Sequence, residues 1–115
     1  MIKVTINGAS GKMGTKVSNL IKNDSSLVEC FDDISCCDLV IDFSQPSSTK
    51  TILKKCVAAK KPIIIGTTGF TNDDLNEIRE AANLIPIVLA ANMSRGMIYL
   101  KKSLASFIHH NQDKL

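Results

Sequence analysis

The stretch Gly8-Ala9-Ser10-Gly11-Lys12-Met13-Gly14 decides the fold, because it joins the apolar run Ile2–Asn7 to a helical pattern over Met13–Lys22. A strand that passes through a glycine-rich turn into a helix typically binds phosphate. The first glycine permits a tight turn, the second lets backbone N–H groups approach an anion, and the third lets the helix pack on the strand. The spacing G-x-x-G-x-x-G differs from the commoner G-x-G-x-x-G, so a glycine-rich turn that binds nothing is the alternative.

The composition indicates one globular domain or less. The chain has 115 residues, of which 44% are hydrophobic, and a net charge of +3. Its lysine doublets form no basic stripe, and no apolar run approaches the ~18 residues of a membrane span. The cysteines have neither C-x2-C spacing nor a nearby histidine; they are Cys30, Cys36, Cys37 and Cys56. We therefore expect reduced thiols, no metal site, no nucleic-acid partner and no membrane.

Strand and helix patterns alternate along the rest of the chain. Further strands are expected at Leu27–Phe31, Leu39–Phe43, Pro62–Ile65 and Pro86–Ala90, and further helices at Pro46–Ala59, Asn72–Ala82 and Met97–Ile108. Pro46 suits the first turn of its helix, and Asn72-Asp73 suits a helix cap. Continuous Ile and Val runs are typical of strands buried on both faces of a parallel sheet covered by helices.

The link between the second and third expected strands consists of Asp32 and the six residues Asp33–Asp38, too few for a helical crossover. Fully extended, they span about 20 Å at most, which barely returns the chain to the start of the next strand. We infer that the usual second helix and the strand after it have been trimmed away. The prediction is an α/β, Rossmann-like doubly wound sheet of order 2-1-3-4-5, with a ligand crevice between the first and third strands.

The loops that follow these strands should meet at the carboxyl edge of the sheet. Asp32 or Asp33 is placed to bind the adenosine ribose, and no basic residue follows directly. Two carboxylates would repel a 2′-phosphate, which favours NADH over NADPH, although Lys12 offers one cation. Gly66-Thr67-Thr68-Gly69 offers two hydroxyls to the nicotinamide side, and Asn92-Met93-Ser94 offers an amide. Read singly, each carboxylate is equally compatible with a solvated turn, and the other two segments indicate a capped turn or a local cap rather than a binding site.

Four motifs in this order resemble the N-terminal portion of the 4-hydroxy-tetrahydrodipicolinate (dihydrodipicolinate) reductase family. They are Gly8–Gly14, Val40–Pro46, Ile65–Phe70 and Ala91–Gly96. The resemblance implies an NAD(P)H-dependent oxidoreductase that reduces 4-hydroxy-tetrahydrodipicolinate in the diaminopimelate route to lysine. It also implies a cytoplasmic homo-oligomer, a tetramer in the family. The residues that it assigns to the cofactor are Gly8, Ala9, Ser10, Gly11, Lys12 and Met13 for the pyrophosphate, Asp32 or Asp33 for the ribose, and Gly66, Thr67, Thr68, Ala90, Ala91, Asn92 and Met93 for the nicotinamide side.

The chain departs from the family where substrate should bind. The family's second domain carries His-His-Arg-x-Lys and Lys-x-Asp-Ala-Pro-Ser-Gly-Thr elements for the general acid and the substrate clamp, and this sequence has neither. His109-His110 lies too early and lacks the Arg-x-Lys, so no catalytic residue is assigned; a solvated helix end explains this pair better. Ile98 stands in place of the family's Asn, and Arg95 in place of a small apolar residue.

We therefore expect residues 1–94 to be a dinucleotide-binding domain and residues 95–115 to be the first helix of a missing substrate and oligomerisation domain. Such a chain should bind cofactor weakly and should not turn over substrate alone. A module that binds NAD without catalysis is the alternative.

Overall fold

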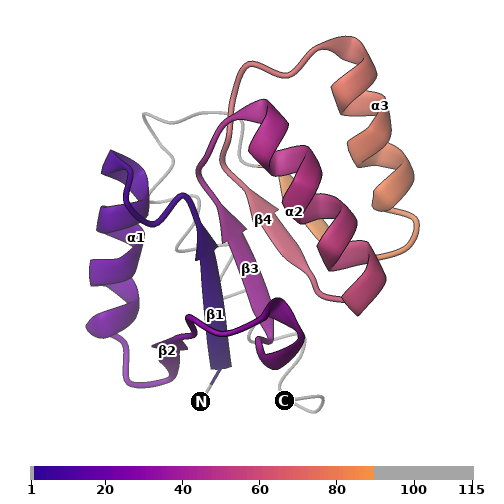
Figure 1. The fold of residues 1–115 in the computed structure, drawn as a ribbon. Helices are drawn as coiled ribbons and strands as arrows, with labels where there is room; N and C mark the ends of the chain where they lie inside the picture. Colours follow the sequence, from indigo (N-terminus) through magenta and orange to yellow (C-terminus); the bar gives the residue numbers. More distant parts are fainter. Residues whose placement is uncertain (1, 90–115) are drawn as a thin grey trace.

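A computed structural model describes residues 2–89, which form a five-stranded sheet with helices on its faces (Figure 1). The strands are β1 (Ile2–Asn7), β2 (Leu27–Glu29), β3 (Leu39–Asp42), β4 (Ile63–Ile65) and β5 (Ile87–Leu89); the helices are α1 (Lys12–Lys22), α2 (Pro46–Ala59), α3 (Asn72–Ala81) and the short 3₁₀ helix η1 (Ile34–Cys36). All neighbouring strands are parallel, and their order is β2-β1-β3-β4-β5. This confirms the predicted fold class and strand order. The expected helix over 97–108 and the expected domain boundary after residue 94 lie outside the described residues.

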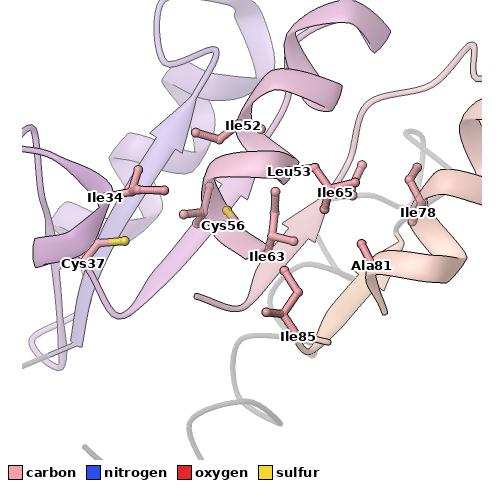
Figure 2. Close-up of a cluster of buried hydrophobic side chains, with 11 residues drawn as sticks. Ile34, Cys37, Ile52, Leu53, Cys56, Ile63, Ile65, Ile78, Ala81 and Ile85 are labelled. Carbon is pink, nitrogen blue, oxygen red and sulfur yellow. The ribbon is translucent and has the colours of Figure 1, made fainter. Parts of the chain in front are cut away.

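The sheet is buried on both sides because its central strands carry almost only branched aliphatic residues. All four residues of β3 are buried, and so are all three of β4. On the α1 side, Val4, Ile6 and Ile41 pack with residues of α1. On the other side, α2 and α3 cover Val40 and Ile63 in a second apolar cluster (Figure 2). No helix among the described residues has the length and apolar character to cross a membrane.

The link from β2 to β3 differs from the extended return that the sequence predicted. β2 ends with Glu29 beside Val4, and β3 begins with Leu39 beside that same residue. The chain therefore only crosses β1 sideways, a distance of about 10 Å for two strand spacings. The spare length forms η1, and the Asp38 N–H donates to the carbonyl of Lys3 at 2.8 Å.

A reciprocal cap fixes the start of α3. The Thr71 hydroxyl accepts the N–H of Asp74 at 3.1 Å, and the Asp74 carboxylate accepts the N–H of Thr71 at 3.0 Å. The prediction that Asn72-Asp73 caps this helix is therefore wrong by one residue, because both lie inside the first turn. Asp74 also forms an ion pair with Lys50 of α2, which ties the two helices together. The hydrogen bond from Lys50 and those from Thr71 hold the pKa of Asp74 below its ordinary value of 3.8.

Candidate functional site

Two glycines of the motif are required by the fold itself, without any ligand. Gly8 has φ +88°, and a Cβ there would lie 2.3 Å from the carbonyl oxygen of Phe43. A Cβ on Gly14 would lie 2.0 Å from the carbonyl oxygen of Gly8. The turn from β1 into α1 is therefore pressed between α1 itself and the end of β3, as expected for the first and third glycines of a phosphate-binding turn.

Gly11 differs from the other two glycines of the motif, because the protein leaves space around it. Its φ is −75°, and the nearest atom to an added Cβ would be the Gly8 carbonyl oxygen at 3.4 Å. The Gly11 N–H closes the turn by donating to that same carbonyl at 3.1 Å, so this amide is used internally. Since the fold does not require glycine here, the bare backbone at Gly11 leaves room for a ligand.

The donors that point out of the turn belong to the start of α1. Within the described residues, the N–H groups of Lys12, Met13 and Gly14 have no acceptor, as expected for the first turn of a helix. This turn contains no acidic residue and begins with Lys12, although acidic residues are what normally stabilise a helix start. Unpaired donors, the helix dipole and a cation therefore all favour an anion at this point.

A hollow of about 170 Å³ opens beside this turn. It lies at the carboxyl ends of β3 and β4, near the switch point where the strand order reverses. The residues that line it are Met13, Phe43, Ser44, Gly66, Thr67 and Thr68. A second hollow of about 190 Å³ shares Thr67 and Thr68 with the first and extends to Phe70, Leu75 and Leu89.

A buried polar network at this edge, centred on Asp42, was not predicted from the sequence. The side chain of Asp42, the last residue of β3, has no solvent exposure. One carboxylate oxygen accepts the amide of Asn7 at 2.9 Å and the hydroxyl of Ser44 at 2.6 Å. The other accepts the hydroxyls of Thr49 at 2.5 Å and Thr67 at 2.7 Å. Four donors from four segments thus satisfy a carboxylate that would otherwise be costly to bury.

One signal in the sequence could have revealed this network. Asp42 ends an otherwise apolar strand, and a strand buried on both faces accommodates a carboxylate only when hydroxyl or N–H donors surround it. The donors themselves come from β1, the loop after β3, α2 and the loop after β4, so only the three-dimensional structure identifies them.

The two threonines after β4 have different surroundings. The Thr67 hydroxyl donates its proton to Asp42 and accepts the N–H of Ser44 at 3.0 Å, and its residue is 5% exposed. Thr68 is exposed to solvent. The expectation that both hydroxyls face a ligand is therefore wrong for Thr67, whose hydroxyl proton is already used inside the protein.

Asp32 and Asp33 do not reach the edge where the other loops meet. β2 stops beside Val4, whereas β1 continues for three more residues, about 10 Å. The link then crosses β1 below its carboxyl end (Figure 1). Asp33 precedes η1 and accepts the hydroxyl of Ser35 at 3.1 Å, whereas the exposed Asp32 makes no hydrogen bond with its side chain inside the described range.

The structure thus brings together Gly8–Met13 and Gly66–Thr68 but not the two carboxylates. Ala90, Ala91, Asn92 and Met93 lie outside the described residues, as does His109-His110. Residues 2–89 contain no group of three or more His, Cys, Asp or Glu side chains that could hold a metal ion.

Comparisons with known proteins agree with this architecture. A family model described as dihydrodipicolinate reductase, N-terminus, matches residues 24–93. The 4-hydroxy-tetrahydrodipicolinate reductases of Akkermansia muciniphila and Clostridium tetani are 39% and 34% identical to the chain. Each match covers 84% of this chain and 43% or 46% of the relative, so the chain spans about half the length of the curated relatives it matches. A solved structure, dipicolinate-bound dihydrodipicolinate reductase from Paenisporosarcina sp. TG-14, has a TM-score of 0.66 at 21% identity over 80% of this chain and 48% of that one, which shows a shared fold.

Proposed function

The chain belongs to the dihydrodipicolinate reductase family, and from this premise we propose that residues 2–89 are the cofactor-binding part of an NAD(P)H-dependent oxidoreductase. The proposed reaction of the whole protein is reduction of 4-hydroxy-tetrahydrodipicolinate in the diaminopimelate route to lysine. The relatives carry the name of that reductase, and the chain spans about half of their length. None of residues 2–89 is assigned a catalytic role.

The start of α1 is the observation that carries this proposal. The oxygens of a cofactor pyrophosphate would accept hydrogen bonds from the free N–H groups of Lys12, Met13 and Gly14. The pyrophosphate would lie over the backbone of Gly11, which has no side chain. Ala9 and Ser10 complete the proposed contact from the preceding turn. The site fits the group because Gly11 has open space where a side chain would interfere with an anion.

The nicotinamide end is proposed to occupy the 170 Å³ hollow between the start of α1 and the end of β4. Gly66 and Thr67 would present backbone to it, and Thr68 would present its exposed side chain. When bound, the cofactor supplies the hydride, whereas the protein binds it, orients it and excludes water. From the family resemblance we add Ala90, Ala91, Asn92 and Met93 to this side.

For the adenosine ribose, the proposed contact with Asp32 or Asp33 rests on the family resemblance alone, because neither residue reaches the edge where the other loops meet. Of the two we propose Asp32, because the carboxylate of Asp33 accepts a hydrogen bond from Ser35. Two adjacent carboxylates disfavour a 2′-phosphate, which supports NADH as the preferred cofactor. We further propose a cytoplasmic homo-oligomer, without nucleic-acid or membrane partners. We propose reduced thiols for the four cysteines, because the sequence has no C-x2-C pair.

Calorimetric titration of the 115-residue chain with NADH and NADPH tests the binding proposal. We expect saturable binding of both, tighter for NADH, and Gly11→Ala should weaken binding at least about tenfold by crowding the pyrophosphate. Lys12→Gln should also weaken binding, whereas Lys22→Gln makes the same charge change about 15 Å away along α1 and should not. Absence of binding at millimolar cofactor, or equal effects of the two lysine changes, would contradict the proposal.

A further inference from the structure

We propose that Asp42 and Thr67 are positioning residues that hold the loop after β4 in the shape that receives the nicotinamide. This inference rests on the proposed function and adds two residues that do their work from inside the protein. It comes from the direction of the Thr67 hydroxyl, which points toward the end of β3.

The hydroxyl of Thr67 joins two loops that must stay at a fixed separation. It donates to Asp42 at 2.7 Å and accepts the backbone N–H of Ser44 at 3.0 Å. Ser44 and Thr67 both line the 170 Å³ hollow, so this one hydroxyl connects two lining residues that come from different loops. Losing it would remove the side-chain link between the two loops and leave the backbone hydrogen bond from the Gly66 N–H to the Asp42 carbonyl at 2.7 Å.

Asp42 in turn is held in place by donors outside the hollow. Asn7 at the end of β1 and Thr49 in α2 each donate to its carboxylate, at 2.9 Å and 2.5 Å. The carboxylate is wholly buried and therefore has no route to solvent or to a ligand. It acts through the two hollow-lining residues that donate to it, Ser44 and Thr67, and Thr67 is the one that belongs to the loop after β4.

Packing at Gly66 supports the same view of a loop with one fixed position. The Phe43 ring occupies the space that a side chain on Gly66 would need, with a ring carbon 2.0 Å from the Cβ position. Backbone after β4 thus lies directly on the Phe43 ring, and the Thr67 hydroxyl fixes the next residue. Thr68 is left exposed at the mouth, where a cofactor amide or ribose would meet it.

The test compares two probes on four forms of the full 115-residue chain. NADH carries the nicotinamide, and ADP-ribose shares everything except that ring. The forms are the unchanged chain, Thr67→Val, Thr67→Ser and Thr5→Val. Thr5→Val is the matched control, because it removes a partly buried threonine hydroxyl of β1 that donates to the Cys30 carbonyl at 3.4 Å and lies outside the Asp42 network.

Thr67→Val should raise the dissociation constant of NADH about tenfold, the effect expected when one positioning hydrogen-bond pair is lost. The dissociation constant of ADP-ribose should change less than twofold. Thr67→Ser should restore both affinities. Thr5→Val should leave the ratio of the two dissociation constants unchanged, because its hydroxyl has no bond to Asp42 or Thr67. If Thr67→Val does not fold, Thr67→Ala removes the same hydroxyl with less bulk, and the same ratio decides.

Equal weakening of both probes by the Thr67 variant, or no weakening of either, would overturn the positioning role while leaving cofactor binding intact. The positioning role would also be overturned if the unchanged chain bound NADH no more tightly than ADP-ribose, because the nicotinamide would then add no affinity. Failure of the unchanged chain to bind either probe would instead overturn the proposed function, and this inference with it.

Discussion

Gly14 shows how a single hydrogen atom in place of a side chain determines where α1 lies. A Cβ there would be 2.0 Å from the Gly8 oxygen and 2.8 Å from Ala9 Cα, and both are backbone atoms that cannot rotate away. Alanine gains about 1 kcal/mol over glycine in helix propensity, whereas overpacking costs about 1–3 kcal/mol or more. We therefore expect Gly14→Ala to lower the free energy of unfolding by about 2 kcal/mol in urea titrations.

Gly11→Ala is the control for that prediction. The added carbon would meet the Gly8 oxygen at 3.4 Å, an ordinary contact, and the backbone φ of −75° suits any residue. Its free energy of unfolding should change by less than about 1 kcal/mol, mainly through the weaker capping of alanine. A Gly14 variant as stable as the Gly11 variant would refute the packing explanation.

The cysteines provide a second prediction at the residue scale. Burial raises the pKa of the Cys56 thiol to about 12, with further contributions from Cys37 and Asp42. At pH 8 almost no Cys56 thiolate exists in the folded protein, whereas Cys36 is exposed. Iodoacetamide should therefore alkylate Cys36 first and Cys56 only after unfolding. Peptide mass spectrometry after timed quenching measures both rates, and equal rates would contradict the burial of Cys56.

The sequence allowed the roles of Gly8 and Gly14 to be predicted, because their reasons lie within one contiguous turn. The fate of Thr67 could not be predicted, because its partners, Asp42 and the Ser44 N–H, come from a strand and loop over twenty residues away. The residue type alone does not tell whether the hydroxyl of a threonine faces a cavity or bonds to the protein interior.

At the scale of elements, the cap of α3 makes stability depend on pH. Lys50 and Thr71 lower the pKa of Asp74 below 3.8, so the folded state favours its charged form. A lowered carboxyl pKa contributes stability above the unfolded pKa, and this stability is lost as the pH falls through the folded pKa. The stability advantage of the unchanged chain over Asp74→Asn should thus be larger at pH 7 than at pH 3.

Urea titrations at the two pH values measure this difference. The control is Asp73→Asn, one residue earlier in the same first turn. Asp73 is exposed and forms no ion pair within residues 2–89, so the stability difference between this variant and the unchanged chain should depend less on pH. An advantage over Asp74→Asn that stays constant with pH would contradict the contribution of the ion pair and cap.

The bounds of β1 and α2 were predicted to the residue. The end of β2 was predicted two residues too late, because the strand expected over Leu27–Phe31 is found over Leu27–Glu29. The reason is the register, because the end of β2 and the start of β3 both lie beside Val4. The chain therefore leaves the sheet after Glu29, and part of the link between the two strands forms η1. Register depends on pairing between strands, which a pattern along one strand does not contain. The same shortening keeps Asp32 away from the edge where we expected it.

At the scale of the whole molecule, the sheet order followed from the shortness of the link between the second and third expected strands. That link is too short for a helical crossover and long enough to pass over one strand, which leaves β3 beside β1. The order then places the glycine-rich turn and the loop after β4 on either side of the end of β3. The site thus follows from the topology, whereas its inner hydrogen bonds do not.

The same topology predicts unequal stability across the sheet. β3 lies between β1 and β4, all its residues are buried, and the Val40 N–H donates to the Pro62 carbonyl at 3.0 Å. β2 has three residues and pairs with β1 alone among the described strands, although the Cys30 N–H beyond it donates to the Val4 carbonyl at a shorter 2.7 Å. We expect cooperative burial, rather than hydrogen-bond length, to determine protection from amide hydrogen exchange. The Val40 amide should then exchange only through global unfolding, whereas the Cys30 amide should exchange when β2 opens locally. Native-state hydrogen exchange in increasing denaturant should then give a steep dependence for Val40 and a shallow one for Cys30. Equal slopes would mean that the trimmed edge folds and unfolds as one unit with the centre of the sheet.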